Sequence, residues 1–162
     1  MITIDTSALD EMMRRLDSQR VKSALRDGMD KAMRDAANQA KLQTPVDTGL
    51  LRASISSEAR EEGGDVIGVV GTNKEYAKPV EYGTGVFSEA PDSKKSPFFP
   101  PPGALEGWAK RHGLNAHAVA WAIFKRGGTR PARMFRSVLE SRFFQTMAVQ
   151  RISDALRRAM ER

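Results

Sequence analysis

The first strong pattern in the chain is a run of apolar positions three and four residues apart. This spacing places them on one face of a helix, and we expect that helix to span about residues 21–42. Pro45 ends it, because proline cannot donate a backbone hydrogen bond and it moves Thr44 out of helical geometry. Ahead of it we expect an edge strand at residues 1–5 and a short helix over residues 9–16, capped by Thr6 or Ser7. The apolar positions of the long helix are Val21, Leu25, Met29, Ala32, Ala36 and Ala40.

The middle of the chain changes to a β pattern. Residues 53–62 and 65–73 are two predicted strands joined by Gly63 and Gly64, a pair that readily takes the positive φ of a tight turn. The segment after them, "EYAKPVEYGTG", begins as a strand or a helical turn and ends at Gly83 and Gly85. The pattern therefore predicts a β-hairpin followed by a short joint.

Residues 86–103 contain five prolines and two adjacent lysines, and they predict a long loop. A loop of this length without regular structure is uncommon in a compact domain, so we expect it to be mobile until a partner binds. Phe98 and Phe99 are its apolar anchors. Two short helices follow at residues 104–112 and 115–126, the second capped by Asn115. Trp108 and Trp121, on these helices, are expected in the core.

The last predicted helix begins after Pro131 and runs to the C-terminus. Its apolar stripe belongs to the core or to a contact between subunits. The fold class is therefore α+β: a long N-terminal and a long C-terminal helix packed on a small antiparallel β-sheet, with the proline-rich loop and the short helices inserted. We expect one domain over residues 1–162. The stripe consists of Phe135, Leu139, Phe143, Met147, Ile152, Leu156 and Met160.

The net charge of +6 is concentrated near the C-terminus. Residues 130–162 hold eight arginines, among them Arg157 and Arg158, against three acidic residues. Such a basic arm is either a solvated helix face or a surface for DNA, for an acidic protein or for a membrane face. Composition alone leaves these alternatives open.

Several kinds of chemistry have no support in the sequence. The chain has no cysteine, which excludes disulfides, thiolate metal sites and a cysteine nucleophile. His112 and His117 are five residues apart and do not share a helix face as a zinc pair does. No phosphate-binding glycine loop is visible. The longest apolar run, residues 118–124, is too short to cross a bilayer, and the N-terminus lacks the layout of a signal peptide. We expect no catalytic residues, cofactor, metal or membrane partner, and synthesis in a cytoplasm.

The tripeptide Asp47-Thr48-Gly49 is the one that carries the catalytic carboxylate in aspartic proteases. In those enzymes two such aspartates meet and share a proton. Here the tripeptide follows a long helix and a proline, and the nearby Arg52 favours an ionised Asp47. We interpret it as a structural joint, in which the side chain of Asp47 or Thr48 caps a short turn over residues 49–53.

Four motifs in this order resemble a known family. They are "TPVDTGLLRASI", a hairpin ending in "VGTN", "EYAKPVEYGT" and "RGGTRPARMFRSVLES". Together they are similar to the tail-completion or neck proteins of long-tailed double-stranded DNA bacteriophages. Two features depart from that pattern: the segment 86–128 is longer than in compact members, and "ARMF" follows Pro131 in place of an immediate phenylalanine.

The resemblance implies a structural virion protein without catalysis, made in the bacterial host and placed in the tail or neck. Its partners would be other phage neck and tail proteins and copies of itself in a ring, commonly a hexamer, with DNA in the lumen as a further contact. The alternatives are a tail terminator or other minor tail protein, and a basic DNA-binding protein.

The resemblance also assigns roles to particular residues. Two sets form structural joints, and a third set contacts a partner or a ring neighbour. The first joint is Thr44, Pro45, Asp47, Thr48 and Gly49; the second is Tyr76, Glu81, Tyr82, Gly83 and Thr84; the contact set is Phe98, Phe99, Pro131, Phe135, Arg157 and Arg158.

Overall fold

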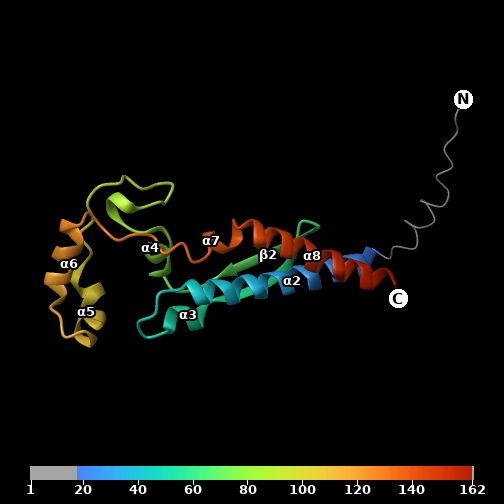
Figure 1. Cartoon of the computed structure of the whole chain (residues 1–162), viewed down its shortest axis with the longest axis horizontal. Coiled ribbons are helices and arrows are strands. Elements are labelled where there is room, and N and C mark those ends of the chain that lie inside the picture. The colour runs from blue at the N-terminus through green and yellow to red at the C-terminus, as the bar shows by residue number, and fades with distance from the viewer. Residues whose placement is uncertain (1–17, 162) are drawn as a thin grey trace, which may run out of the picture. The chain divides into compact units, whose positions relative to one another are not determined.

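A computed structural model describes residues 18–161, so the expected N-terminal strand and short helix lie outside the described residues. The described chain forms two compact units. Unit 1 contains residues 18–37, Ser56–Val70 and residues 140–161, and unit 2 contains Asn38–Ile55 and Gly71–Leu139. The α+β class is confirmed (Figure 1). Whether the two units fold as one domain stays a prediction.

Helix α2, Ser18–Gln43, is the long N-terminal helix that the periodicity predicts. Its most buried positions are small residues one turn apart, among them Ala24, Ala32 and Ala36, with exposed fractions of 6% or less. Small side chains at this spacing let other elements approach the helix backbone closely. The helix ends where Thr44 donates its hydroxyl to the Ala40 carbonyl at 2.7 Å, which satisfies one of the carbonyls that a helix end leaves open.

The predicted hairpin is present. Strand β1, Ser56–Glu62, pairs with β2, Asp65–Gly71, around a turn in which Gly63 and Gly64 have φ of 61° and 96°. A two-stranded hairpin is marginal alone in water, and this one packs on α2. A Cβ on Gly68 would lie 2.6 Å from Cγ of Met33, so the strand backbone rests directly on methionine side chains.

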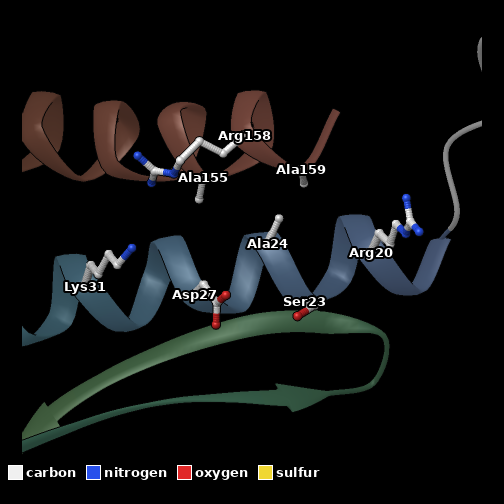
Figure 2. Close-up of a pocket in the computed structure, with 8 residues that line it drawn as sticks. All are labelled: Arg20, Ser23, Ala24, Asp27, Lys31, Ala155, Arg158 and Ala159. Atoms are coloured by element: carbon white, nitrogen blue, oxygen red, sulfur yellow. The ribbon is translucent and has the colours of Figure 1, made fainter. Parts of the chain in front are cut away.

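Helix α8, Arg142–Met160, packs on α2 within the same unit. The closest approach is at Gly28, where an added Cβ would lie 2.7 Å from Cα of Ile152. Arg151 also donates to Asp35 at 3.0 Å. In the close-up of unit 1, α2 lies between α8 and the hairpin (Figure 2). Unit 1 is thus built around one central helix.

The prediction of a single helix from Phe135 to Met160 was wrong. Helix α7, Arg136–Leu139, ends before Glu140, and α8 begins again after Ser141. The Ser141 hydroxyl accepts a hydrogen bond from the Phe144 amide at 3.1 Å, a side-chain cap that starts a new helix. The new start changes which residues are buried: Phe144 is 7% exposed and Phe143 is 77% exposed, although the stripe contained Phe143.

Unit 2 consists of short helices and irregular segments. The expected loop is largely present, because residues 88–101 form neither helix nor strand; its mobility stays a prediction. Asn115 caps α6 as predicted, accepting from the Ala118 amide at 3.1 Å. The expectation of core tryptophans was wrong, since Trp108 and Trp121 are 38% and 52% exposed. The helices of unit 2 besides α7 are α3 (Leu50–Ser54), α4 (Ala77–Tyr82), the 3-10 turn η1 (Gly85–Phe87), α5 (Pro102–Arg111) and α6 (Ala116–Lys125).

Candidate functional site

Three of the four sequence motifs meet around one side chain in unit 2. Met134 is fully buried and forms an apolar cluster with Leu51 and Ala77, against which Val80 and Phe135 pack. Thr44 is also buried, with its hydroxyl 3.5 Å from the Met134 sulfur. Leu51 comes from the first motif, Ala77 from "EYAKPVEYGT" and Met134 from the last motif. We call this cluster, with the backbone segments that enclose it, the motif junction.

Glu81 is the buried charged group of the junction. Its residue is 4% exposed, and its carboxylate accepts from the backbone amides of Phe135 and Arg136, each at 3.0 Å. These amides open α7 and have no partner within that helix. The side chain of Arg136 adds an ion-pair contact, with Nε 3.4 Å from a Glu81 oxygen. A side chain 54 residues away in sequence therefore caps α7.

The residues after Glu81 fasten a second chain segment, residues 127–133, to the first. Gly83 has φ of 71°, and a Cβ there would lie 2.6 Å from the Thr129 carbonyl oxygen. The Thr84 amide donates to that carbonyl at 2.9 Å, and the Thr84 hydroxyl accepts from the Thr129 amide at 3.0 Å. Glycine is required here by both the backbone angle and the close approach. Pro131 lies in this paired segment.

Two arginines of the basic arm are held inside the junction region by Glu89. Arg133 donates from Nε at 2.8 Å and Arg136 from a terminal nitrogen at 2.6 Å. Hydrogen bonds from Arg133, and then from Arg136, lower the pKa of Glu89 to about 2. Arg136 also lies over the Tyr82 ring, 4.7 Å from its centroid. Both arginines therefore have a carboxylate partner within the chain, and Arg133 remains exposed.

Sequence reasoning missed Glu89. It lies in the predicted loop, and no local pattern connects it with arginines more than 40 residues later. A surplus of arginines in one segment was the available signal, since unpaired cations of that number favour acidic partners elsewhere in the chain.

Asp47 does not cap α3, and this part of the prediction was wrong. Gly49 occupies the N-cap position with φ of 78°, and no side chain there accepts a capping hydrogen bond. Asp47 instead accepts hydrogen bonds from Arg111, with Nε at 3.3 Å, and its other close neighbour is Nε2 of His112 at 3.5 Å. The hydrogen bonds from Arg111 lower the pKa of Asp47. Arg111 takes the role that the sequence assigned to Arg52.

The family described as "Bacteriophage HK97-gp10, putative tail-component" matches residues 8–83. The chain resembles a bacteriophage tail component over this segment. No curated protein and no solved structure matches the chain.

The matched segment contains the first motif, the hairpin and the motif "EYAKPVEYGT" up to Gly83. The resemblance drawn from the motifs is therefore confirmed for that part of the chain, and it supports a tail component located in the virion. The last motif lies outside the match. It is connected to the matched segment by the junction itself, through the bonds that Val80 and Glu81 accept from the amides of residues 132, 133, 135 and 136.

Beside the junction, unit 2 has an open groove of about 600 Å³. Its lining comes from the first motif, from α5 and from Tyr76, and it includes several exposed apolar side chains. Leu50 is 59% exposed and Val46 55% exposed. Asp47 and Arg111 stand on its wall as a neutralised pair. The first joint thus supports an apolar surface as well as a turn.

The residues expected to contact a partner are not brought together. Phe98 and Phe99 are exposed, and the Phe99 ring packs edge-on against Trp121 and Phe124, with centroids 6.4 and 6.0 Å away. Phe135 instead packs against the junction cluster. Arg157 and Arg158 are exposed on α8, in the other unit. Within unit 2, the exposed Phe98 and Phe99 and the junction residue Phe135 therefore belong to different clusters.

Arg158 lies at a cleft of about 430 Å³ within unit 1. Figure 2 shows Ala24 of α2 and Ala155 and Ala159 of α8 pointing into the space between the two helices. The cations Arg20, Lys31 and Arg158 line the same cleft, with Ser23 and Asp27. We call this the basic cleft.

Within residues 18–161, no helix is long and apolar enough to cross a membrane. Within the same range no three histidine or acidic side chains are grouped so that they could hold a metal ion.

Proposed function

We propose that the protein is a structural component of a tailed bacteriophage virion, acting in tail completion or head–tail joining as a ring-forming neck subunit without catalysis. The ring would be a hexamer. The observation that carries the proposal is the family match over residues 8–83. The junction connects this matched segment to the last motif and to the rest of unit 2.

The chemistry of the junction supports a scaffolding role for the assigned residues. The Glu81 carboxylate is bound to two amides, Asp47 to Arg111, and Glu89 to two arginines. A general acid or base needs a proton that it can exchange near the working pH. The lowered pKa values of Asp47 and Glu89 move these groups away from that condition.

Exposed apolar side chains in both units support assembly with other subunits. Phe143 is 77% exposed in unit 1, and Leu50 and Trp121 are 59% and 52% exposed in unit 2. A ring subunit needs two different patches, each meeting the other on its neighbour, and closure then fixes the number of copies. Patches of this kind on separate parts of one chain meet that requirement.

The decisive experiment is to delete the gene from the phage or prophage that encodes it and to complement the deletion from a plasmid. In negative stain of the deletion mutant we expect filled heads and separate tails, and after complementation we expect joined particles. Tails of irregular length would favour the tail-terminator alternative. Normal infectious particles without the protein, or its absence from purified wild-type virions, would overturn the proposal.

The DNA-binding alternative has weaker support. Arg133 and Arg136 pair with Glu89, and Arg151 pairs with Asp35, so three of the eight C-terminal arginines have carboxylate partners within the chain. Binding to duplex DNA between 50 and 200 mM salt tests it, because phosphate contacts lose affinity steeply as salt rises. Tight binding that weakens with that slope would revive this alternative.

A further inference from the structure

The end of the β-hairpin is acidic and exposed. Within Ser56–Val70 there are four carboxylates and one cation, Arg60, which gives a net charge of −3. The positions from 60 to 65 are all exposed. At the turn, Cβ atoms added to Gly63 and Gly64 would meet nothing within 4 Å. The tip is therefore bare backbone with carboxylates on both sides. These carboxylates are Glu58, Glu61, Glu62 and Asp65.

The basic cleft has the opposite charge. Among the described residues, three cations and the Asp27 carboxylate line it, and alanine methyl groups point into it (Figure 2). Methyl groups leave room for a backbone to approach, and a turn built from two glycines presents no side chain to block that approach. The two surfaces are opposite in charge, and neither has a large side chain at its centre.

The two surfaces also lie on different faces of α2. The hairpin packs against the side of α2 that carries Met33, while the cleft lies between α2 and α8. A contact between the hairpin tip on one face and a cleft on another joins two copies head to tail. Contacts of this type close into rings or continue as filaments, according to the rotation between neighbours.

We propose that the hairpin tip of one copy docks in the basic cleft of the next copy. The inference rests on the proposed ring-forming function and names the two surfaces that form the ring contact. Arg158, which the sequence analysis placed among the residues that contact a partner or a ring neighbour, lies in this cleft, whereas its neighbour Arg157 does not line it.

Duplex DNA is the other anionic occupant to consider. The phosphate backbone is uniformly negative, so the Asp27 carboxylate in the cleft opposes it. The hairpin tip carries Arg60 among its carboxylates, and a mixed set of charges suits a cleft that is itself mixed. This detail favours a second copy of the chain.

Charge reversal tests the contact. Lys31→Glu with Arg158→Glu reverses the cleft, and Glu61→Lys with Glu62→Lys reverses the tip. Either pair of changes places like charges against each other between neighbours. We expect at least a tenfold higher protein concentration for half-assembly, measured by native mass spectrometry and light scattering at low salt, with an unchanged far-UV circular dichroism spectrum.

Combining the reversals provides the rescue. A chain carrying all four changes has a positive tip and a negative cleft, so its copies should assemble again. An equimolar mixture of the cleft-reversed and tip-reversed proteins should also assemble, as an alternating ring with an even number of subunits. Lys110→Glu with Arg142→Glu is the matched control: it makes the same charge change at two exposed cations outside the cleft and should leave assembly unchanged.

The outcomes separate this inference from the proposed function. If wild-type protein forms no ring, alone or in virions, both fail. If wild type assembles and the reversed variants assemble equally well, or the four-change chain is not rescued, the hairpin contact is wrong and the neck function stands. If cleft reversal weakens binding to duplex DNA while tip reversal leaves assembly intact, the occupant is DNA and the inference is overturned.

Discussion

Each of the two units is stabilised internally by a different kind of interaction. In unit 1, α2 meets the hairpin and α8 through glycines and alanines, at approaches where an added Cβ at Gly28 or Gly68 would collide. In unit 2, the junction depends on the buried Glu81 carboxylate and on backbone bonds between segments about 45 residues apart. The close packing of unit 1 is sensitive to added side-chain volume. The junction of unit 2 is sensitive to the loss of a hydrogen-bond acceptor. A different type of substitution should therefore destabilise each unit.

The largest effect should follow from Glu81→Ala, which removes the acceptor for two amides and the charge that faces Arg136. Breaking a buried charged pair by removing one partner costs about 3 to 5 kcal/mol. We expect a loss of unit 2 stability of this order in urea unfolding. Both tryptophans lie in unit 2, so their fluorescence reports this unit.

Glu81→Gln is the control for this experiment. The amide oxygen still accepts one hydrogen bond, so the loss should be smaller, about 1 to 3 kcal/mol. Equal losses for alanine and glutamine would show that the negative charge facing Arg136, and not the hydrogen-bond acceptors, stabilises the junction.

The next largest effect should come from Gly28→Ala in unit 1. The new methyl group would meet the Ile152 backbone, and overpacking of this kind costs about 1 to 3 kcal/mol. Gly107→Ala is the matched control, because the nearest atom to its Cβ is the flexible end of Arg111 at 3.4 Å. At that site alanine should stabilise the helix by about 0.5 to 1 kcal/mol.

Gly28→Ala also tests the prediction that residues 1–162 form a single domain. Circular dichroism follows all helices, whereas tryptophan fluorescence follows unit 2 alone. If Gly28→Ala shifts both unfolding transitions equally, the two units unfold as one domain. A shift in circular dichroism with unchanged fluorescence would instead divide residues 1–162 into two folding domains.

A smaller effect concerns acid stability. The pKa of Glu89 is lowered from 4.5 to about 2 in the folded state. A carboxylate of this kind stabilises the fold fully above pH 4.5, and that stability is lost as the pH falls toward 2. The melting temperature of wild type should therefore fall more steeply between pH 4.5 and 2 than that of Glu89→Gln. Parallel curves for the two proteins would contradict this assignment.

The smallest effect is expected for Asp47→Asn. The pair with Arg111 is solvent-exposed, and exposed ion pairs contribute little to stability. Melting temperature and plaque formation in complementation should stay close to wild type. Pepstatin-sensitive peptide cleavage that disappears in this variant would contradict the structural interpretation of the tripeptide.

The sequence predicted those parts of the fold that depend on neighbouring residues. The periodicity of α2, the diglycine turn of the hairpin and the Asn115 cap are local signals, and each is confirmed. The Ser141 cap is also local. However, apolar residues recur every four positions on both sides of it, and this spacing concealed the break between α7 and α8. A serine three residues before the Phe144 amide was the available signal.

The contacts of the site residues were beyond local reading. Glu81 was assigned to a joint, but its partners lie 54 and 55 residues away, and Arg111 reaches Asp47 across 64 residues. Hydrogen bonds of this range depend on which segments the folded chain brings together, and a single sequence holds no direct record of that.

The glycine at the crossing of α2 and α8 also determines the register of the two helices. A slide of α8 by one turn, about 5.4 Å, would place the methyl group of Ala24 or Ala32 against the Ile152 backbone, where only the hydrogen atom of Gly28 now fits. The contact at Gly28 therefore disfavours a slide by one turn in either direction. The alignment determines which side chains of α8 face α2 and which remain on its outer face for a neighbour. The absence of a Cβ atom at Gly28 therefore affects the surface that α8 exposes.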